Sequence, residues 1–301
     1  MPSWQSNLFR RLARLSKPRT VGAATEIAEL RRQYAYLSDR FGAAPSDVVF
    51  EFGQVGPIKG EWVKIAPSTE RVILYFHGGG YIAGSPETHR PLIARLCQAS
   101  DANAFVPAYR LAPEFVFPAA VRDGIDSYRH LVSKGVDSNA ITVAGDGSGG
   151  GLAFAVLLAA RNAGLAMPGA AVAMSPWADL SLSGMSLLAN ESNDTALSWE
   201  LLFLSARNYL RKTNPCDQYA SPAFANFRDF PPIMVHAGGF EILKDDASRI
   251  GDRAADAGTP VSIEIYDSMQ HIFQANPYVP EARVSLQRLG QFIKSKTGSR
   301  A

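Results

Sequence analysis

Strand-like apolar runs alternate with helix-like stretches from about residue 70 to the end of the 301-residue chain, and this alternation limits the possible folds more than any other feature. Short uninterrupted apolar runs favour buried strands, and the apolar spacing between them favours helices. The alternation predicts an α/β fold, with a mostly parallel sheet and helices on both faces. The expected strands are 71–76, 103–108, 141–144, 171–174, 232–235 and 261–266, and the expected helices are 86–99, 118–134, 149–163, 241–257 and 280–296.

Two amphipathic segments lie outside this alternation, and we expect them to form a helical cap. Residues 1–45 precede every expected strand, and residues 180–212 insert a polar loop followed by an apolar helix. Segments added outside an α/β core commonly form a lid. We therefore expect N-terminal cap helices at 1–45 and one α/β domain at 46–301 with a cap insertion at about 180–212. A hairpin at 48–52 and 60–65 is expected at one edge of the sheet.

The net charge, the length of the apolar runs and the number of cysteines limit which partners and which cellular compartment we expect for this protein. A formal net charge of +2 gives no reason to expect nucleic acid as a partner. The longest apolar run, 152–160, is shorter than the ~18 residues that span a bilayer, so we expect no stable membrane insertion. Arginines interrupt the leucines near the N-terminus, which argues against a secretion signal, so we expect a cytoplasmic protein. The same residues form a basic amphipathic helix. We expect this helix to pack as part of the cap rather than on a membrane surface. Cys97 and Cys216 form no metal-type cluster and are expected as free thiols.

Residues 77–80, with the sequence HGGG, directly follow the first long expected strand and fit an oxyanion hole. Acyl transfer passes through a tetrahedral oxyanion that preorganised N–H groups stabilise. Consecutive glycines allow the backbone to approach that oxygen because no Cβ obstructs it. The motif alone also fits a tight turn, but a second glycine-rich turn at 145–151 follows in the chain order of an α/β-hydrolase site and favours the oxyanion hole.

This second turn resembles the nucleophile elbow of a serine hydrolase from which the serine is missing. In the pattern G-x-S-x-G, the central serine lies on a sharp turn between a strand and a helix. Gly145 and Gly149 occupy the outer positions, Gly147 occupies the nucleophile position, and a serine follows one residue later as Ser148.

Taken together, the motifs resemble those of the hormone-sensitive lipase family of α/β-hydrolases, bacterial type, over about residues 45–301. The matching segments are 77–80, 109–114, 117–120, 145–151, 175–179 and 221–222. The resemblance implies an eight-stranded sheet, a helical cap, and hydrolysis of short-acyl carboxylic esters by a carboxylesterase. It also implies neither a metal nor an organic cofactor, and it makes a homodimer reasonable.

The resemblance and the chain order locate the other two members of a catalytic triad, since the acid should follow the elbow and the base should follow the acid. Glu241 aligns with the acid, although the family often has aspartate there, and His271 aligns with the base. Asp245 and Asp246 better suit the N-terminus of a helix. A serine at position 147 would attack the ester carbonyl, His271 would take its proton, and Glu241 would orient His271.

The oxyanion hole and the substrate pocket complete the expected site. The backbone N–H groups of Gly78, Gly79 and Ser148 are expected to stabilise the oxyanion. Candidates to line the substrate pocket are Tyr81, Trp177 and Phe240.

Three explanations fit Gly147. The chain is an engineered variant of a G-D-S-S-G-G-G parent, or a non-catalytic relative that binds a ligand, or an enzyme in which Ser148 acts. We favour the first, because a single substitution restores the full motif. The elbow aims its central side chain at the base. A shift to the next residue would displace the oxygen by on the order of 3 Å, which argues against Ser148.

The sequence therefore predicts a carboxylic ester hydrolase with a Ser-His-Glu mechanism and a small-molecule ester as its partner, inactive as written because Gly147 replaces the nucleophile. Two alternatives stay open: a ligand-binding pseudoenzyme on the same fold, and a hydrolase of lactones or amides. The intact residues 77–80, Glu241 and His271 argue against the pseudoenzyme, because a long-idle site is expected to lose more than one part.

Overall fold

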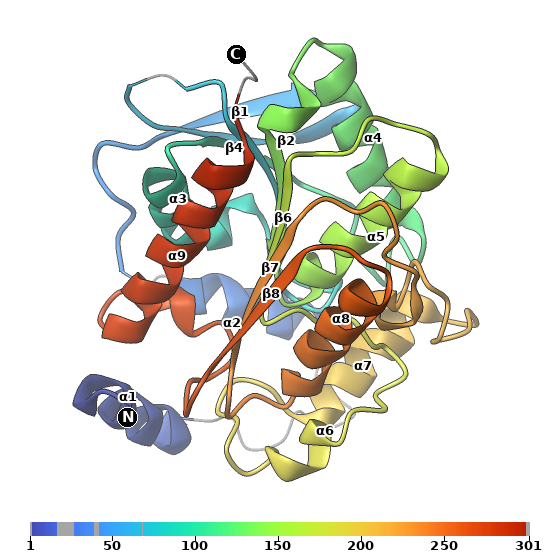
Figure 1. The fold of residues 1–301 in the computed structure, drawn as a ribbon. Coiled ribbons are helices and arrows are strands. Elements are labelled where there is room, and N and C mark those ends of the chain that lie inside the picture. The colour runs from blue at the N-terminus through green and yellow to red at the C-terminus, as the bar shows by residue number, and fades with distance from the viewer. Residues whose placement is uncertain (1, 17–26, 39–41, 68, 299–301) are drawn as a thin grey trace.

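A single sheet of eight strands forms the centre of the computed structural model, which describes residues 2–16, 27–38, 42–67 and 69–298 (Figure 1). The strands lie in the order β1-β2-β4-β3-β5-β6-β7-β8. β2 is antiparallel to its neighbours β1 and β4, and the remaining pairs are parallel. The strands are β1 Val49–Val55, β2 Ile58–Lys64, β3 Val72–Phe76, β4 Asn103–Pro107, β5 Ile141–Asp146, β6 Ala170–Met174, β7 Ile233–Gly238 and β8 Val261–Tyr266.

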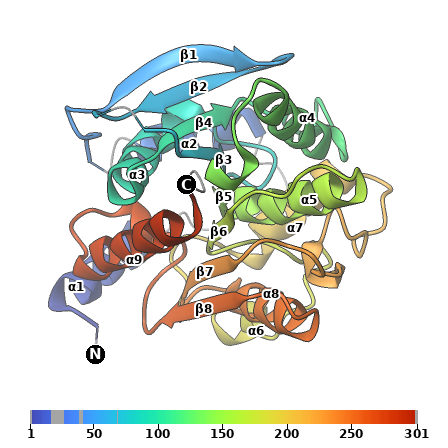
Figure 2. The same cartoon turned by 45° about the horizontal axis from the view of Figure 1, so that its top comes forward.

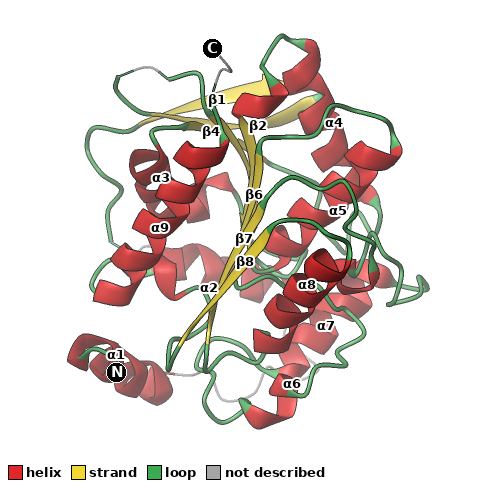
Figure 3. Cartoon of the chain, in the orientation of Figure 1, coloured by secondary structure: helices red, strands yellow, loops and turns green. Residues whose placement is uncertain are grey.

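Helices cover both faces of this sheet and give it three layers (Figure 3). Every residue of β3, β5 and β6 is buried, as their uninterrupted apolar runs predict. Two clusters of buried apolar side chains fill the space on either side. The helices are α3 Pro86–Ser100 and α9 Pro280–Lys296 on one face, and α4 Ala119–Ser133, α5 Ser148–Asn162 and α8 Lys244–Asp256 on the other. The expected α/β class, the eight-stranded sheet and its edge hairpin are therefore confirmed.

Four further helices gather near the carboxyl ends of the parallel strands, in the lower part of Figure 1. These helices are α1 Trp4–Ser16, α2 Ile27–Ser38, α6 Ser186–Ala189 and α7 Trp199–Leu210. The turned view of Figure 2 shows the sheet between α3 and α9 on one side and α4, α5 and α8 on the other. The short helix α6 was not expected. The described residues also include the 3₁₀ turns η2 Ser138–Ala140, η3 Pro222–Phe224 and η4 Phe273–Ala275.

The helix expected at 241–257 begins three residues later, at Lys244. Residues 239–243 instead form a turn that follows β7. The N–H of Gly239 donates to Tyr266 O at 2.8 Å, and the N–H of Phe240 donates to Met269 O at 3.0 Å. The prediction was wrong at this boundary because bonds to the chain after β8 hold the turn, and helical spacing in the sequence does not reveal them.

Gly149, in the glycine-rich turn at 145–151, lies too close to a neighbouring backbone segment to carry a side chain. A Cβ on Gly149 would lie 2.0 Å from Phe76 O and 2.5 Å from His77 O. The N-terminus of α5 therefore packs directly on the backbone that connects β3 to the HGGG loop. Any side chain at this position would push the two segments apart.

We expect the substitution Gly149→Ala to destabilise the fold, because the clash is with backbone carbonyl groups that cannot rotate away. Overpacking of this kind costs about 1–3 kcal/mol. The measurement is the melting temperature, compared with that of Gly184→Ala, where the new Cβ would come no closer than 3.3 Å to the described atoms. Equal melting temperatures for the two variants would contradict the close approach.

Candidate active site

Gly147 forms the sharp turn between β5 and α5, with φ 51° and ψ −123°. Its N–H donates to Met174 O at 3.0 Å, and its carbonyl oxygen accepts the N–H of Trp177 at 2.8 Å. A residue other than glycine would be strained at this positive φ, as the nucleophile of an elbow is. A Cβ on Gly147 would have the imidazole of His271 as its nearest described neighbour, with Nε2 at 3.5 Å. A side chain at position 147 would therefore face His271.

His271 is paired with Glu241, the other expected member of the site. The distance between His271 Nδ1 and Glu241 Oε2 is 2.8 Å, and the carboxylate is fully buried. Its second oxygen, Oε1, accepts the N–H of Gly238 at 2.9 Å. Because a carboxylate only accepts hydrogen bonds, it holds the imidazole proton on Nδ1 and leaves the lone pair of Nε2 directed towards Gly147.

Burial and charge act in opposite directions on this pair. Burial lowers the pKa of His271, but the hydrogen bond and the negative charge of Glu241 outweigh it, so the pKa of His271 lies above its ordinary value. Burial raises the pKa of Glu241, and the hydrogen bond from His271 offsets only part of that rise. The pair is therefore a base that is strengthened by its carboxylate partner.

Ser148 occupies the first position of α5, and its hydroxyl lies away from the Glu241–His271 pair. The Ser148 side chain is buried, and its Oγ accepts the N–H of Tyr81 at 3.3 Å. The same hydroxyl hydrogen-bonds with Tyr109. The Ser148 N–H belongs to the first turn of a helix, where backbone donors have no partner within the helix.

The N–H of Gly78 is directed beneath the HGGG loop and not towards Gly147. It donates to Asp146 Oδ1 at 3.1 Å, and that oxygen also accepts the Tyr75 hydroxyl at 2.7 Å. Asp146 is 1% exposed. The structure therefore contradicts the expectation that Gly78 donates to an oxyanion, because a buried carboxylate competes for its N–H.

The loop continues through two glycines with positive φ, 120° at Gly79 and 65° at Gly80. The carbonyl oxygen of Gly79 accepts the N–H of Ala83 at 2.9 Å, which closes the loop on itself. Burial lowers the pKa of His77 to about 3, so this histidine is neutral and supports the loop by packing on Tyr109.

Of the three expected pocket residues, two pack within the protein. Tyr81 and Trp177 are both 1% exposed. The Tyr81 ring stacks on Tyr209 of α7 with a centroid distance of 4.0 Å, and the Trp177 indole N–H donates to Asp179 O at 3.1 Å. Phe240 is half-buried, and the guanidinium of Arg10 lies 4.9 Å from the centre of its ring.

The insertion between β6 and β7 holds the loop that carries the acid. The side-chain amide of Asn190 donates to Gly239 O at 3.1 Å and to Glu241 O at 2.9 Å. The buried carboxylate of Asp194 accepts the N–H of Ile242 at 2.9 Å. Both contacts join residues about 50 positions apart, and neither was foreseen.

The loop that carries the base is held in the same way. The backbone N–H and the hydroxyl of Thr195 both donate to Gln270 Oε1, at 2.9 and 2.8 Å. Gln270 precedes His271 directly. On the other side of the histidine, Ile272 donates its N–H to Ser175 Oγ at 3.1 Å, and the Ser175 hydroxyl also bonds to Glu241. The insertion and the end of β6 thus position both members of the pair.

The two acidic residues after Glu241 have anchoring roles. Asp246 accepts the N–H groups of Ala178 and Asp179 at 2.7 and 2.8 Å, and burial raises the pKa of its carboxyl group to about 8. Asp245 accepts the N–H of Ser186 at 2.8 Å. Both carboxylates therefore hold the start of the insertion, which leaves Glu241 as the partner of His271.

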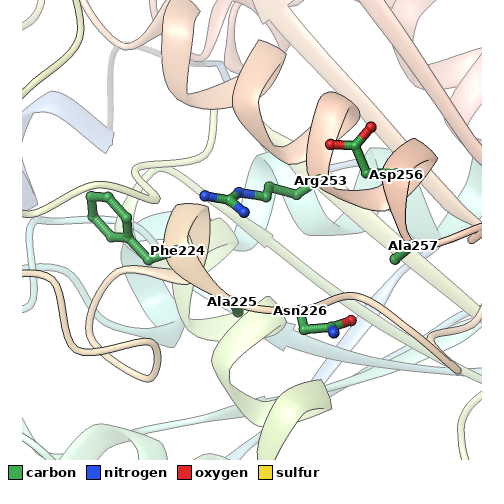
Figure 4. Close-up of a pocket in the computed structure, with 6 residues that line it drawn as sticks. All are labelled: Phe224, Ala225, Asn226, Arg253, Asp256 and Ala257. Atoms are coloured by element: carbon green, nitrogen blue, oxygen red, sulfur yellow. The ribbon is translucent and has the colours of Figure 1, made fainter.

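In the part of the chain that the structure describes, no group of three or more His, Cys, Asp or Glu side chains could hold a metal ion. No described helix is long and apolar enough to cross a membrane. A hollow of about 200 Å³ lies between η3 and the end of α8 (Figure 4). Its lining includes Arg253 and Asp256 and none of the expected site residues.

The fold and this geometry together define a class of protein. A strand–turn–helix elbow that faces a histidine–carboxylate pair, with a glycine loop beside it, is the arrangement of serine-type α/β-hydrolases. A family model described as the alpha/beta hydrolase fold matches residues 73–275. The chain belongs to this family, and within it to the bacterial hormone-sensitive lipase type.

Similar proteins agree with this assignment. The chain is 40% identical to an acetyl-hydrolase of Streptomyces hygroscopicus over 273 residues, which is 90% of this chain and 89% of that protein. It is 34% identical to an esterase of Acinetobacter venetianus, covering 79% of each. The crystal structure of EstE5 soaked with p-nitrophenyl butyrate matches with a TM-score of 0.93 and 34% identity over 98% of this chain and 99% of that one. An esterase of the bacterial hormone-sensitive lipase family matches with a TM-score of 0.93 and 33% identity, over 99% of this chain and 100% of that one.

Removing the charge of Glu241 should weaken the base. In the variant Glu241→Gln we expect the pKa of His271 to fall, because the neutral amide no longer stabilises the imidazolium. NMR titration of the histidine ring resonances measures this shift, and the distant His130 in the same spectra serves as an internal control. An unchanged His271 titration would show that the 2.8 Å contact is not formed in solution.

Asp194 should affect both the stability of the protein and the titration of His271. Its carboxylate accepts buried N–H groups, and its charge favours protonated His271. The variant Asp194→Asn is expected to lose about 1.5–3 kcal/mol of folding stability and to show a lower His271 pKa. Glu200→Gln, which removes an exposed charge from the same insertion, is the matched control. A His271 titration that changes equally in both variants would refute the role of Asp194.

Proposed function

We propose that this chain carries the site of a carboxylic ester hydrolase for short-acyl esters, and that the site lacks its nucleophile because Gly147 occupies the serine position. The observation that carries this proposal is the direction of a Cβ on Gly147, whose nearest described neighbour is His271 Nε2 at 3.5 Å. The preference for short acyl groups is supported by the similarity to an acetyl-hydrolase and to an esterase soaked with p-nitrophenyl butyrate.

In the complete mechanism, a serine at position 147 attacks the ester carbonyl while Nε2 of His271 takes its proton. His271 then gives this proton to the leaving alcohol, and Glu241 stabilises the imidazolium between the two steps. Since Asp146 binds the Gly78 N–H, we assign the oxyanion to the N–H groups of Gly79, Gly80 and Ser148. Water then releases the acid from the acyl-enzyme by the same route.

We further propose that residues 1–45 and 180–212 form a cap over this site, with residues 46–301 as the catalytic domain. The grouping of α1, α2, α6 and α7 near the carboxyl ends of the strands supports this division (Figure 1). Arg10 over Phe240 and the contact of Tyr209 with Tyr81 join the two cap segments to the loops of the site.

A ligand-binding pseudoenzyme on the same fold is the second candidate. The specific observation in its favour is that the hydroxyl of Ser148 contacts Tyr81 and Tyr109, so the neighbouring serine does not replace the absent nucleophile. A lactone or an amide would use the same groups as an ester, and the geometry of the pair suits all three.

The variant Gly147→Ser should hydrolyse p-nitrophenyl acetate and butyrate. We expect its kcat to exceed that of the unchanged chain by at least about 10³-fold, since loss of the nucleophile costs a serine hydrolase up to about 10⁶-fold. The rate should rise with pH through the His271 pKa, which lies above its ordinary value, because only the unprotonated imidazole accepts the serine proton.

Two results would count against this proposal. If neither the unchanged chain nor Gly147→Ser hydrolyses the acetate, the butyrate, a lactone or an anilide, the result favours the pseudoenzyme. A melting temperature that rises in Gly147→Ser would contradict a strained elbow, because φ 51° at this position favours glycine.

A further inference from the structure

The space beside His271 is the feature of this chain that the serine mechanism leaves without a role. The three atoms that a Cβ on Gly147 would meet among the described residues are His271 Nε2 at 3.5 Å, His271 Cε1 at 3.8 Å and Gly78 Cα at 3.9 Å. These are ordinary van der Waals distances, so no described atom blocks a Cβ that projects from position 147 towards the imidazole. One wall of this space is a basic nitrogen.

The base remains assembled although position 147 has no side chain. Glu241 holds Nδ1 of His271 at 2.8 Å, and Gly238 holds the other carboxylate oxygen at 2.9 Å. Asn190 and Thr195 fix the two loops from the insertion. None of these contacts involves position 147, so the lone pair of Nε2 keeps its direction without a serine. The His271 side chain is 11% exposed, which leaves it accessible to small molecules.

We propose that this chain, as it stands, hydrolyses activated esters in one step, with water in the place of the serine hydroxyl and without an acyl-enzyme. The proposal rests on the ester site proposed above, but it replaces the nucleophile. The space adjoins His271 Nε2, a hydrogen-bond acceptor, and the first turn of α5, where backbone N–H groups lack the usual partner four residues earlier in the helix. A water molecule needs such polar partners.

The bonds and protons balance as follows. The water oxygen forms a bond to the carbonyl carbon while one water proton moves to Nε2 of His271. The carbonyl electron pair moves to its oxygen, which the N–H groups of Gly79, Gly80 and Ser148 stabilise. The bond between this carbon and the alkoxy oxygen then breaks, and His271 returns its proton to the leaving oxygen. The products are a carboxylic acid and an alcohol, and no bond to the protein forms.

The chemistry limits the substrates to esters with good leaving groups, such as aryl and enol esters. General base catalysis contributes about 10²–10⁴-fold, which is far less than the contribution of a complete triad. Methanol is a second acyl acceptor for this site. Its hydroxyl donates to Nε2 of His271 as water does, and attack by its oxygen gives a methyl ester.

The test is the hydrolysis of p-nitrophenyl acetate by the purified chain and four variants. We expect a steady release of nitrophenol without a burst, at a rate above that of buffer. The rate should fall at least about tenfold in His271→Gln, which removes the base. It should fall equally in Gly147→Ala, whose methyl group fills the space. The rate should stay unchanged in His130→Gln, the matched control on α4. Phenylmethylsulfonyl fluoride labels a nucleophilic serine, so among these proteins only Gly147→Ser should gain mass when incubated with it.

The methyl ester gives an independent readout. With methanol added, the ratio of methyl acetate to acetate should exceed the ratio found in buffer, and this excess should disappear in Gly147→Ala. Gly147→Ser is the folding control for Gly147→Ala, because both variants add a Cβ at the same backbone position. If Gly147→Ser folds and is active, the fold tolerates a Cβ there. Loss of activity in Gly147→Ala therefore cannot be attributed to unfolding if Gly147→Ser is active.

Several results would overturn the proposal. A burst with an acetylated protein would identify a covalent nucleophile, and a rate that survives His271→Gln or Gly147→Ala would place the reaction elsewhere. If the unchanged chain hydrolyses the ester no faster than buffer while Gly147→Ser is active, the attack by water is refuted and the proposed ester site stands. If neither the unchanged chain nor Gly147→Ser hydrolyses the ester, the proposed ester site is refuted as well.

Discussion

A carboxylate buried at the end of a sheet loses the water that normally stabilises its charge, and it stays ionised only where other groups replace that water. Glu241 obtains these groups from the imidazole of His271, the N–H of Gly238 and the hydroxyl of Ser175. These groups come from the residue that follows β6, from the end of β7 and from the loop after β8. The Glu241–His271 bond therefore sets the positions of the turns after β6, β7 and β8.

The elbow adds a second constraint, which acts on the backbone alone. Gly147 must adopt a positive φ to connect β5 with α5, and Gly149 must lack a Cβ to let α5 lie on the backbone after β3. Neither requirement depends on a nucleophile. The architecture of a serine hydrolase thus persists around a residue that has no side chain, which is why a base and a space for a reactant lie side by side here.

The sequence predicted the strands and most helices, because the central strands are short and mostly apolar and alternate with longer stretches of helical spacing. It also predicted Glu241 and His271 from chain order and family resemblance. It did not predict that Asp146 accepts the N–H of Gly78, since this donor and its acceptor lie 68 residues apart in the chain. Asn190, Asp194 and Thr195 were missed for the same physical reason. Their partners lie 48 to 75 residues away, and a polar run such as 190–195 has the composition of any surface loop.

The hydrogen bonds from the insertion to the two loops have a consequence for how a substrate enters. A lid that swings on a hinge must break its contacts with the body below it. If residues 190–195 moved in this way, the loops of Glu241 and His271 would lose Asn190, Asp194 and Thr195 together. Opening on that side would therefore disassemble the base. The insertion therefore belongs to the wall of the site, and a substrate that leaves the base intact enters without motion of residues 190–195.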